Sequence, residues 1–474
     1  MTDSVLKDIY SIQIGSEDII AKQISSILSE TNDSSDFIND YQNEKRLLEI
    51  LKEIRVRIWT LLKTDNVSFL VGAGASISAG GVSLATIPNE LEEKLVLLAK
   101  KEVQDRRLPS WITLFYKTVS ALCDRQFAYK ERTLFFRDID TQDIEAIPVN
   151  LEDYLSHLYM WLSGIGENGE SVTLKKLDGN KLIINKATLE TLIRKINCCL
   201  TAILDLPVEG KEHTLNIHRK FLKKILTRPL NLRRVNLFTL NYDTLIEKGA
   251  DAEGAVLVDG FVGTLQRVFR PESYDLDFYF PAQTTEGRVH RFDRAMHLYK
   301  LHGSITWYKT LPGWENPYGL YATFFKQDNK EDEVIIYPSP LKYGQALDLP
   351  YSELFRRFGN SVAQPQAVLF TIGYGFGDEH VNAIIRQALA IPSFTLVVVD
   401  PEPNNDFVVE LMNLGDDRVW IVRGWELGTF EHFVNKLLPD LREEEIEAKV
   451  MKTFQTLTFK NNVIQKEEEC SCDE

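Results

Sequence analysis

The sequence predicts an α/β protein with a Rossmann-like, doubly wound parallel sheet and an inserted helical module. Three observations lead to this fold class. An apolar run at 67–71 stops at two glycines and a serine, as a buried strand does before a tight turn. From Val235 onward, short β-prone runs alternate with helical segments, which is typical of parallel strands joined by helices. Between these regions, residues 88–230 are mainly helical in their periodicity.

Residues 1–64 are expected to form a helical N-terminal extension. Apolar side chains recur at helical spacing in its second half, at Leu47, Leu48, Leu51, Ile54 and Ile58. A polar stretch from Thr31 to Ser35 interrupts the helical pattern. No function can be read from this extension.

The segment from Val67 to Ser76 has the pattern of a strand followed by a phosphate-binding turn. Gly72 and Gly74 would let the backbone turn sharply and approach a pyrophosphate, and the next helix would offer unpaired N–H donors at its start. A complete Gly-x-Gly-x-x-Gly motif would have its third glycine where this chain has Ile77. The turn by itself therefore fits either a dinucleotide site or an ordinary tight turn.

The predicted helical module covers residues 88–230. Its apolar positions share helical faces, for example Leu91, Leu95 and Leu98, or Leu192, Ile196, Leu200, Ile203 and Leu204. The stretch 170–184 instead has the composition of a hairpin around Asp178-Gly179-Asn180. Asn150 is placed to cap the helix that follows it, which is a structural role.

The remaining strands of the predicted sheet are six short apolar runs, at 235–240, 297–301, 334–337, 367–372, 394–399 and 418–422. Together with residues 65–87 they form one nucleotide-binding domain, which continues over 231–440 after the helical module. Residues 441–474 are expected to form a C-terminal helix and an acidic, disordered tail.

Composition and charge restrict the class of protein. A chain of 474 residues can form about two to three domains, and its formal net charge of -15 at pH 7 repels phosphate backbones. Direct nucleic-acid binding is therefore not expected. The five cysteines do not suggest a disulfide framework in a chain of this length, and no apolar stretch approaches a membrane-spanning length. We expect a cytoplasmic protein without membrane attachment.

Polar residues follow most of the predicted strands. Ligands of open α/β sheets bind beyond the carboxyl ends of the strands, so these residues form the candidate site. In chain order they are Gly72, Ala73, Gly74, Ser76, Asn241, Asp243, His302, Gly373, Tyr374, Asp378 and Asp400. Together they supply contacts for phosphate, ribose and base, and one group that titrates near neutral pH.

Each of these residues also has an ordinary structural explanation. Asn241, Asp243 and Asp378 precede helical segments, where Asn and Asp often act as caps. A lone histidine before a glycine, such as His302, more often bonds backbone in a turn. Asp400 precedes a proline and is typical of a strand end that opens a turn. The grouping at one sheet edge is what favours a site.

Three segments in this order resemble the sirtuin family of NAD-consuming proteins: Gly72-Ala-Gly-Ala-Ser76, Asn241-Tyr-Asp243 and Lys300-Leu-His-Gly-Ser304. Two later segments, Tyr337-Pro-Ser-Pro-Leu-Lys342 and Gly373-Tyr-Gly-Phe-Gly-Asp-Glu-His-Val-Asn382, look like the bacterial sirtuin-like branch of antiphage defence systems. The resemblance covers residues 65 to 435. It is carried by the set of motifs, because each motif alone is unspecific.

The resemblance implies roles for the candidate residues. The turn of Gly72, Ala73, Gly74 and Ser76 matches the one that holds the NAD phosphates. Asn241 matches the asparagine that positions a water or a ribose hydroxyl, Asp243 the acid near the nicotinamide amide, and His302 the active-site histidine. Gly373 and Tyr374 are expected to contact NAD+, and Asp400 to bind the adenosine ribose. Asn241 and His302 are thus the implied catalytic residues.

Departures from the family pattern indicate which activity to expect. Protein-deacylating sirtuins typically carry a four-cysteine zinc module, but this chain has no Cys-x-x-Cys and no cysteine between Cys199 and Cys470. We therefore expect no metal. Deacylases also usually have Gln before the Asn of the motif, where this chain has Leu240, and Asp-Phe-Arg where it has Asn89-Glu-Leu91. Because these residues are missing, binding of an acyl-lysine peptide is less expected than NAD+ cleavage.

The resemblance implies an NAD+ glycohydrolase (NADase) that releases nicotinamide and ADP-ribose, as the effector of an antiphage, abortive-infection system. Its partners would be NAD+, further copies in a homo-oligomer, and an activator such as a HerA-like ATPase or a phage-triggered protein. Two alternatives stay open. One is an NAD-dependent protein deacylase or ADP-ribosyltransferase. The other is a non-catalytic sensor of NAD or ADP-ribose.

Overall fold

The computed structural model describes residues 11–20, 41–82, 86–103, 108–122, 151–166, 168–175, 181–206, 212–280, 290–324, 333–335 and 350–442. Five predicted features lie outside these residues. They are the polar stretch from Thr31 to Ser35, the Asn150 cap, the Asp178-Gly179-Asn180 turn, the segment from Tyr337 to Lys342, and the chain beyond residue 442.

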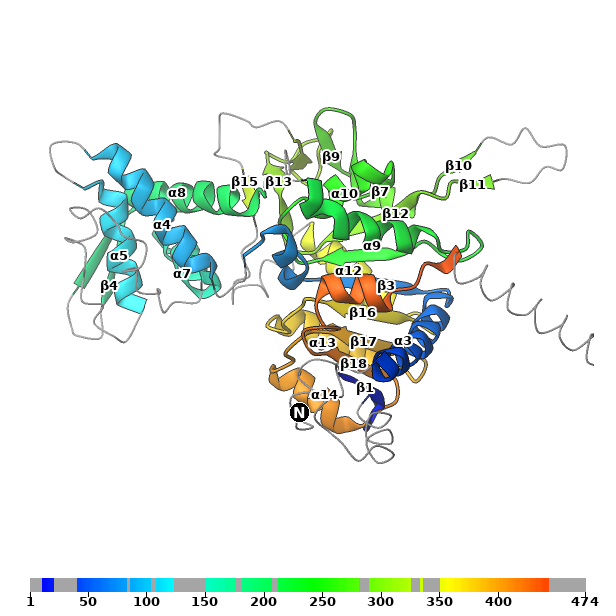
Figure 1. The fold of residues 1–474 in the computed structure, drawn as a ribbon. Coiled ribbons are helices and arrows are strands. Elements are labelled where there is room, and N and C mark those ends of the chain that lie inside the picture. The colour runs from blue at the N-terminus through cyan, green and yellow to red at the C-terminus, as the bar shows by residue number, and fades with distance from the viewer. Residues whose placement is uncertain are drawn as a thin grey trace, which may run out of the picture.

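A nine-stranded sheet forms the centre of the described structure (Figure 1). The strand order is β2-β1-β18-β17-β16-β3-β6-β12-β7, and the neighbours from β18 to β7 pair in parallel. These parallel strands are β3 (Val67–Val71), β6 (Asn236–Thr239), β7 (Val256–Val258), β12 (Ala295–Lys300), β16 (Val368–Ile372), β17 (Thr395–Val399) and β18 (Val419–Arg423). The predicted α/β fold with a large, mostly parallel sheet is confirmed.

The N-terminal segment corrects the prediction of a helical extension, because its first described part consists of strands. β1 (Ser11–Ile14) pairs antiparallel with β18, and β2 (Glu17–Asp18) pairs with β1, so both strands extend the sheet at one edge. The alternation in Ser11 to Ile14 is too short to stand out from its polar surroundings. The later part forms the helix α3 (Tyr41–Leu62), whose apolar face packs on the sheet.

Helices cover both faces of the sheet. The alternating side chains of each strand divide the core between the faces: Phe69 and Val71 of β3 belong to one cluster, and Leu70 belongs to the other. The first cluster includes α3, α9 (Asn216–Leu226), α10 (Leu245–Glu253), α15 (Phe430–His432) and the π-helix Phe433–Leu437. The second includes α12 (Tyr351–Val362), α13 (Glu379–Leu389) and α14 (Asp406–Leu414).

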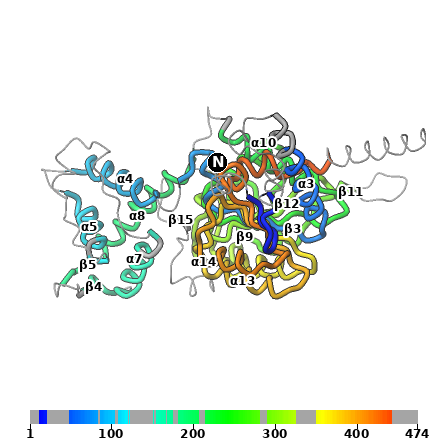
Figure 2. The backbone as a smooth tube through the Cα atoms, turned by 60° about the horizontal axis from the view of Figure 1, so that its bottom comes forward, coloured from blue at the N-terminus to red at the C-terminus, as the bar shows by residue number. Residues whose placement is uncertain are grey.

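A group of helices and a hairpin lies to one side of the sheet, at the left of Figure 1 and again in Figure 2. They are α4 (Ile87–Glu102), α5 (Ser110–Leu122), α7 (Leu151–Ile165) and α8 (Lys186–Leu204), with β4 (Ser171–Lys175) paired to β5 (Lys181–Asn185). Their buried side chains form a hydrophobic cluster separate from the two that flank the sheet. The hairpin composition of 170–184 is confirmed by the β4–β5 pairing.

A second, antiparallel sheet is separate from the main one and has the strand order β15-β13-β14-β9-β8. Its strands are β8 (Phe261–Val262), β9 (Arg267–Phe269), β13 (Gly303–Lys309), β14 (Leu320–Ala322) and β15 (Glu333–Ile335). The run predicted at 334–337 was assigned to the parallel sheet, which is wrong: its described part is β15 and pairs with β13. A short apolar run carries no information about its pairing partner.

Four further short elements lie near α9 and the second sheet along the chain. β10 (Tyr279–Phe280) pairs antiparallel with β11 (His290–Arg291). Two 3₁₀ helices, Glu212–Leu215 and Pro271–Asp275, precede α9 and β10 respectively.

Candidate functional site

The candidate residues follow the carboxyl ends of five adjacent strands. β17, which Asp400 follows, is next to β16, and β16, β3, β6 and β12 are neighbours in the sheet. Gly373 and Gly72 come directly after β16 and β3, and Asn241 and His302 come two residues after β6 and β12. The topology therefore gathers segments that are far apart in the sequence at one edge of the sheet.

Close packing between two backbone turns accounts for three of the predicted glycines. A Cβ atom on Gly72 would lie 2.5 Å from the carbonyl oxygen of Gly373, and one on Gly74 would lie 2.7 Å from the Gly373 Cα. Gly373 itself has a φ of 60°, in the left-handed region that favours glycine. In this structure the glycines let the turns after β3 and β16 touch.

The chain after Gly72 does not form the predicted helix start. Two 3₁₀ helices, Ala73–Ala75 and Ile77–Ala79, follow β3. The N–H groups of Ala75 and Ser76 donate within this turn, to the carbonyls of Gly72 and Ala73, at 3.1 and 3.0 Å. The expectation of a row of unpaired donors is wrong here, because 3₁₀ bonding uses amide groups that the first turn of an α-helix leaves open.

Asn241 and Ser76 form the centre of the site's hydrogen-bond network. The Asn241 Nδ2 group donates to the carbonyl oxygen of Gly72 and to Ser76 Oγ, both at 2.9 Å. Ser76 Oγ in turn donates to Asp243 Oδ2 at 2.6 Å. With both donations made by Nδ2, the amide orientation is fixed, and Oδ1 is the atom that can accept from a ligand or water.

Asp243 is buried and has a structural task. Its Oδ1 accepts from the Leu245 N–H at 3.0 Å at the start of α10, while its Oδ2 accepts from Ser76. Thr244 is the N-cap residue of α10, so Asp243 forms an Asx turn just before the helix and is not its cap as the structural explanation had it. Both carboxylate oxygens are used within the chain, and a contact with nicotinamide stays a prediction.

His302 is buried against the aspartate that precedes α13. Its Nε2 lies 3.0 Å from Asp378 Oδ2, and the side chains of both residues are less than a tenth exposed. Asp378 Oδ1 also accepts from the N–H groups of His380 and Val381, at 2.9 and 3.4 Å, and so caps α13. The cap expected for Asp378 is present, together with a histidine contact that the sequence does not indicate.

The Asn241 loop and the His302 segment are linked to each other. The Tyr242 and His302 rings lie 6.3 Å apart between centroids. The carbonyl oxygen of Tyr242 accepts from the Ile305 N–H at 3.1 Å and from Ser304 Oγ at 3.4 Å. Hydrogen bonds from residues 304 and 305 to Tyr242 therefore connect the loop that carries Asn241 to the segment that carries His302.

The loop after Gly373 is rigidly bonded to itself. The hydroxyl group of Tyr374 lies 3.2 Å from the Asp378 carbonyl oxygen and 3.0 Å from Asn382 Oδ1, and its single proton can be donated to either acceptor. Phe376 has a φ of 54°, which is rare for a residue with a side chain, and it is fully buried. Backbone strain of this kind persists where surrounding contacts hold it, and it clusters at functional loops. A contact of Tyr374 with NAD+ stays a prediction.

Asp400, at the end of β17, opens a turn. Its Oδ1 accepts from the Glu402 N–H at 2.9 Å, which is the ordinary structural explanation of this residue. Burial raises the pKa of its carboxyl group, and the bond from Glu402 opposes that shift. Ribose binding by Asp400 stays a prediction.

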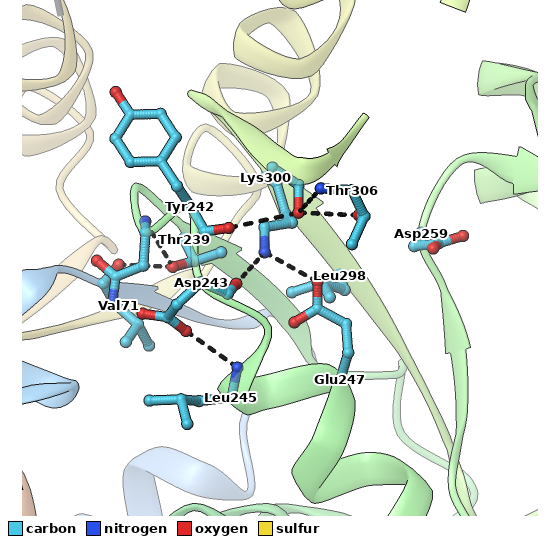
Figure 3. A network of polar contacts seen from close by, with 12 residues as sticks. Val71, Thr239, Tyr242, Asp243, Leu245, Glu247, Asp259, Leu298, Lys300 and Thr306 are labelled. Atoms are coloured by element: carbon cyan, nitrogen blue, oxygen red, sulfur yellow. Dashed lines mark hydrogen bonds and ion pairs between the residues drawn. The ribbon is translucent and has the colours of Figure 1, made fainter. Parts of the chain in front are cut away.

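The sequence does not indicate a role for Lys300 or Glu247, although Lys300 begins the segment Lys300-Leu-His-Gly-Ser304. Lys300, the last residue of β12, is buried and donates from Nζ to the Asp243 carbonyl oxygen and to Glu247 Oε1, the latter at 2.8 Å (Figure 3). A lysine inside a strand and a glutamate inside a helix are usually read as solvent-exposed, and only the tertiary contact shows otherwise.

Comparison with protein families shows a similarity to a known domain. A model of the SIR2-like domain matches residues 235–412, which span β6, His302, Asp378 and Asp400. The match supports a sirtuin-like family and an NAD-related activity. A search of curated proteins gives no match.

Metal ligands and membrane-spanning helices were sought in the described residues. These residues contain no group of three or more His, Cys, Asp or Glu side chains arranged to hold a metal ion. Among the helices described, none combines the length and apolar character that crossing a membrane requires.

Proposed function

We propose that this protein is an NAD+ glycohydrolase that cleaves NAD+ to nicotinamide and ADP-ribose. The observation that carries the proposal is that the Asn241 loop and the His302 segment lie side by side at one edge of the sheet. The Asn241 side chain is held by Gly72 and Ser76, and the His302 ring is paired with Asp378. The SIR2-like match to residues 235–412 supports an NAD-related substrate. The absence of the Cys-x-x-Cys zinc pattern from the sequence favours hydrolysis over protein deacylation.

The reaction breaks the bond between the ribose C1′ and the nicotinamide nitrogen. The electron pair leaves with nicotinamide, and a water oxygen forms the new bond to C1′. The ribose carbon carries positive charge in the transition state, so the site must orient the dinucleotide and supply one placed water. The proton that the water loses needs an acceptor within hydrogen-bond reach.

Asn241 is suited to positioning that water or a ribose hydroxyl. Its Nδ2 is occupied by Gly72 and Ser76, which directs Oδ1 outward from that pair of bonds. An amide oxygen accepts a hydrogen bond without taking the proton, so this residue orients the nucleophile. Rigid support of this kind lowers the cost of ordering the reacting group.

His302 is suited to accept the proton. When Asp378 accepts from Nε2–H, the proton is held on Nε2, and Nδ1 is then the basic nitrogen of the ring. The same aspartate caps α13, so the helix fixes the orientation of the imidazole. His302 thus has the arrangement of a base oriented by a third group.

The biological role proposed is the effector of a bacterial antiphage system. Continuous NAD+ hydrolysis would kill the host cell, so activity would be coupled to a partner or to assembly. The helices α4, α5, α7 and α8, with their own core, are proposed as an inserted module that contributes an oligomer surface. A HerA-like ATPase or a phage-triggered protein is the proposed activator, by analogy with the family.

Nicotinamide release from NAD+ tests the proposal, measured by chromatography with the protein alone and with the product of a neighbouring gene. Release that is lost in His302→Ala supports the hydrolase. NAD+ binding by calorimetry without release under either condition would instead favour the sensor alternative. Release that depends on an added acyl-lysine peptide would favour the deacylase.

A further inference from the structure

A buried ion pair lies directly beneath the Asn241 loop. The side chain of Lys300 is 3% exposed and that of Glu247 is 13% exposed, and Nζ lies 2.8 Å from Glu247 Oε1. Lys300 Nζ also donates to the main-chain carbonyl of Asp243. Figure 3 shows the ammonium group between this loop and α10. Lys300 therefore contacts the backbone of the loop, as well as a side chain of the helix that follows it.

The loop is held from two sides. On one side, Asn241 and Asp243 bond through their side chains to Gly72 and Ser76. On the other side, the segment after β12 bonds the Tyr242 carbonyl, and Lys300 bonds the Asp243 carbonyl. Lys300 is two residues before His302 in the sequence, so it joins the loop to the segment that carries the histidine.

The pair is not the arrangement that stability alone would favour. Glu247 Oε2 is buried and has no hydrogen-bond partner in the described part of the chain. Burial raises the pKa of Glu247, and the charge of Lys300 opposes that rise. Replacing a buried ion pair by apolar side chains of similar volume is often neutral or stabilising, so a half-satisfied pair needs another explanation.

We infer that Lys300 and Glu247 are positioning residues that set the Asn241–Asp243 loop relative to His302. The inference rests on the proposed NAD+ hydrolysis. Neither residue is proposed to touch the substrate. Lys300 acts through the Asp243 carbonyl, and Glu247 holds the lysine in place and balances its charge. A displacement of about 1 Å at a reacting group lowers turnover by about a hundredfold.

The test is the double variant Lys300→Met/Glu247→Leu, which removes both charges without leaving one unpaired. We expect its thermal midpoint within about 5 °C of wild type. Its kcat for nicotinamide release should fall about a hundredfold with KM nearly unchanged, because the loop shifts while the rest of the site stays. Amide hydrogen exchange at residues 241–245 should become faster.

The matched control is a second, largely buried ion pair, between Asp259, which precedes β8, and Arg267 of β9. Asp259 Oδ2 lies 2.8 Å from Arg267 Nη1, with 14% and 23% of their side chains exposed. Asp259→Leu/Arg267→Met should keep both the wild-type kcat and the wild-type exchange at 241–245. If the Lys300 double variant does not fold, Lys300→Arg replaces it. That variant keeps the charge but moves the donor, and we expect a lower kcat at unchanged KM.

A Lys300→Met/Glu247→Leu protein with wild-type kcat and wild-type exchange would overturn the inference, as would wild-type turnover in Lys300→Arg. Wild-type protein that releases no nicotinamide contradicts the hydrolase instead. In that case the exchange rate at 241–245 still decides whether Lys300 holds the loop. The two failures are therefore distinguishable.

Discussion

Asp378 contacts His302 with one carboxylate oxygen and caps α13 with the other. The first contact is 3.0 Å, from Oδ2 to Nε2, and the second is 2.9 Å, from Oδ1 to the His380 N–H. One side chain thus joins a helix N-terminus to the proposed base. Asp378 therefore has a structural role through Oδ1, which caps the helix, and a proposed chemical role through Oδ2, which contacts the histidine.

Asp378→Asn separates the two tasks. Asparagine caps helices about as well as aspartate, so we expect the fold and the thermal midpoint to be nearly unchanged. The loss of the carboxylate removes the charged partner of His302, and kcat for nicotinamide release should fall by about a hundredfold. Steady-state kinetics with NAD+ measure this. Turnover equal to wild type in the Asp378→Asn variant would mean that the aspartate only caps the helix.

Asn241→Ala should abolish turnover and also reduce stability slightly. The side chain makes two donations, to Gly72 and Ser76, and a net hydrogen bond contributes about 1 kcal/mol. We expect the free energy of unfolding, from urea titration, to fall by about 1 to 2 kcal/mol. Global unfolding of the variant at neutral pH would show that Asn241 is mainly structural.

The glycine turns allow a prediction with a matched control. A Cβ atom on Gly74 would lie 2.7 Å from the Gly373 Cα, whereas one on Gly375 would have nothing within 4 Å. Gly74→Ala should therefore lower the free energy of unfolding by about 1 to 3 kcal/mol. Gly375→Ala should change it by less than about 0.5 kcal/mol. Equal effects in the two variants would contradict the close packing of the turns.

Stability should fall on the acid side because of His297. Burial lowers the pKa of this residue from 6.5 to about 4, and the charge of Arg234 adds to the effect. The unfolded chain takes up this proton at a higher pH than the folded chain does. His297 therefore contributes stability above pH 6.5, and that contribution is lost as pH falls toward 4.

His297→Gln tests this contribution. As the pH falls from 6.5 to 4, the free energy of unfolding of wild type should decrease by up to about 3 kcal/mol more than that of the variant. Urea titrations at several pH values measure the difference. The exposed His290 supplies the control, and His290→Gln should follow the wild-type curve. Parallel curves for wild type and His297→Gln would contradict the burial effect.

The fold was largely predictable because parallel strands buried on both faces leave continuous apolar runs. The run at 67–71 and the later runs at 367–372 and 394–399 all contain strands of the main sheet. The short β1 strand and the partner of β15 were not predictable, because they depend on pairing between distant segments. Local pattern does not encode such pairing.

The candidate site was predictable as a set of strand ends, but its internal contacts were not. The sequence indicates that Gly72, Asn241 and His302 share one sheet edge, since parallel strands end together. It does not indicate that Gly74 packs against Gly373, or that Asp378 reaches His302. Those contacts depend on the strand order β16-β3-β6-β12, which a single sequence does not specify.

Nicotinamide release from NAD+ by wild type and His302→Ala, with Gly375→Ala as the control, tests the central claim most directly. Each protein would be assayed alone and with the product of a neighbouring gene. We expect release by wild type and Gly375→Ala and none by a folded His302→Ala. Release by His302→Ala at the wild-type rate would contradict the proposed role of this histidine, and no release by any protein would contradict the hydrolase.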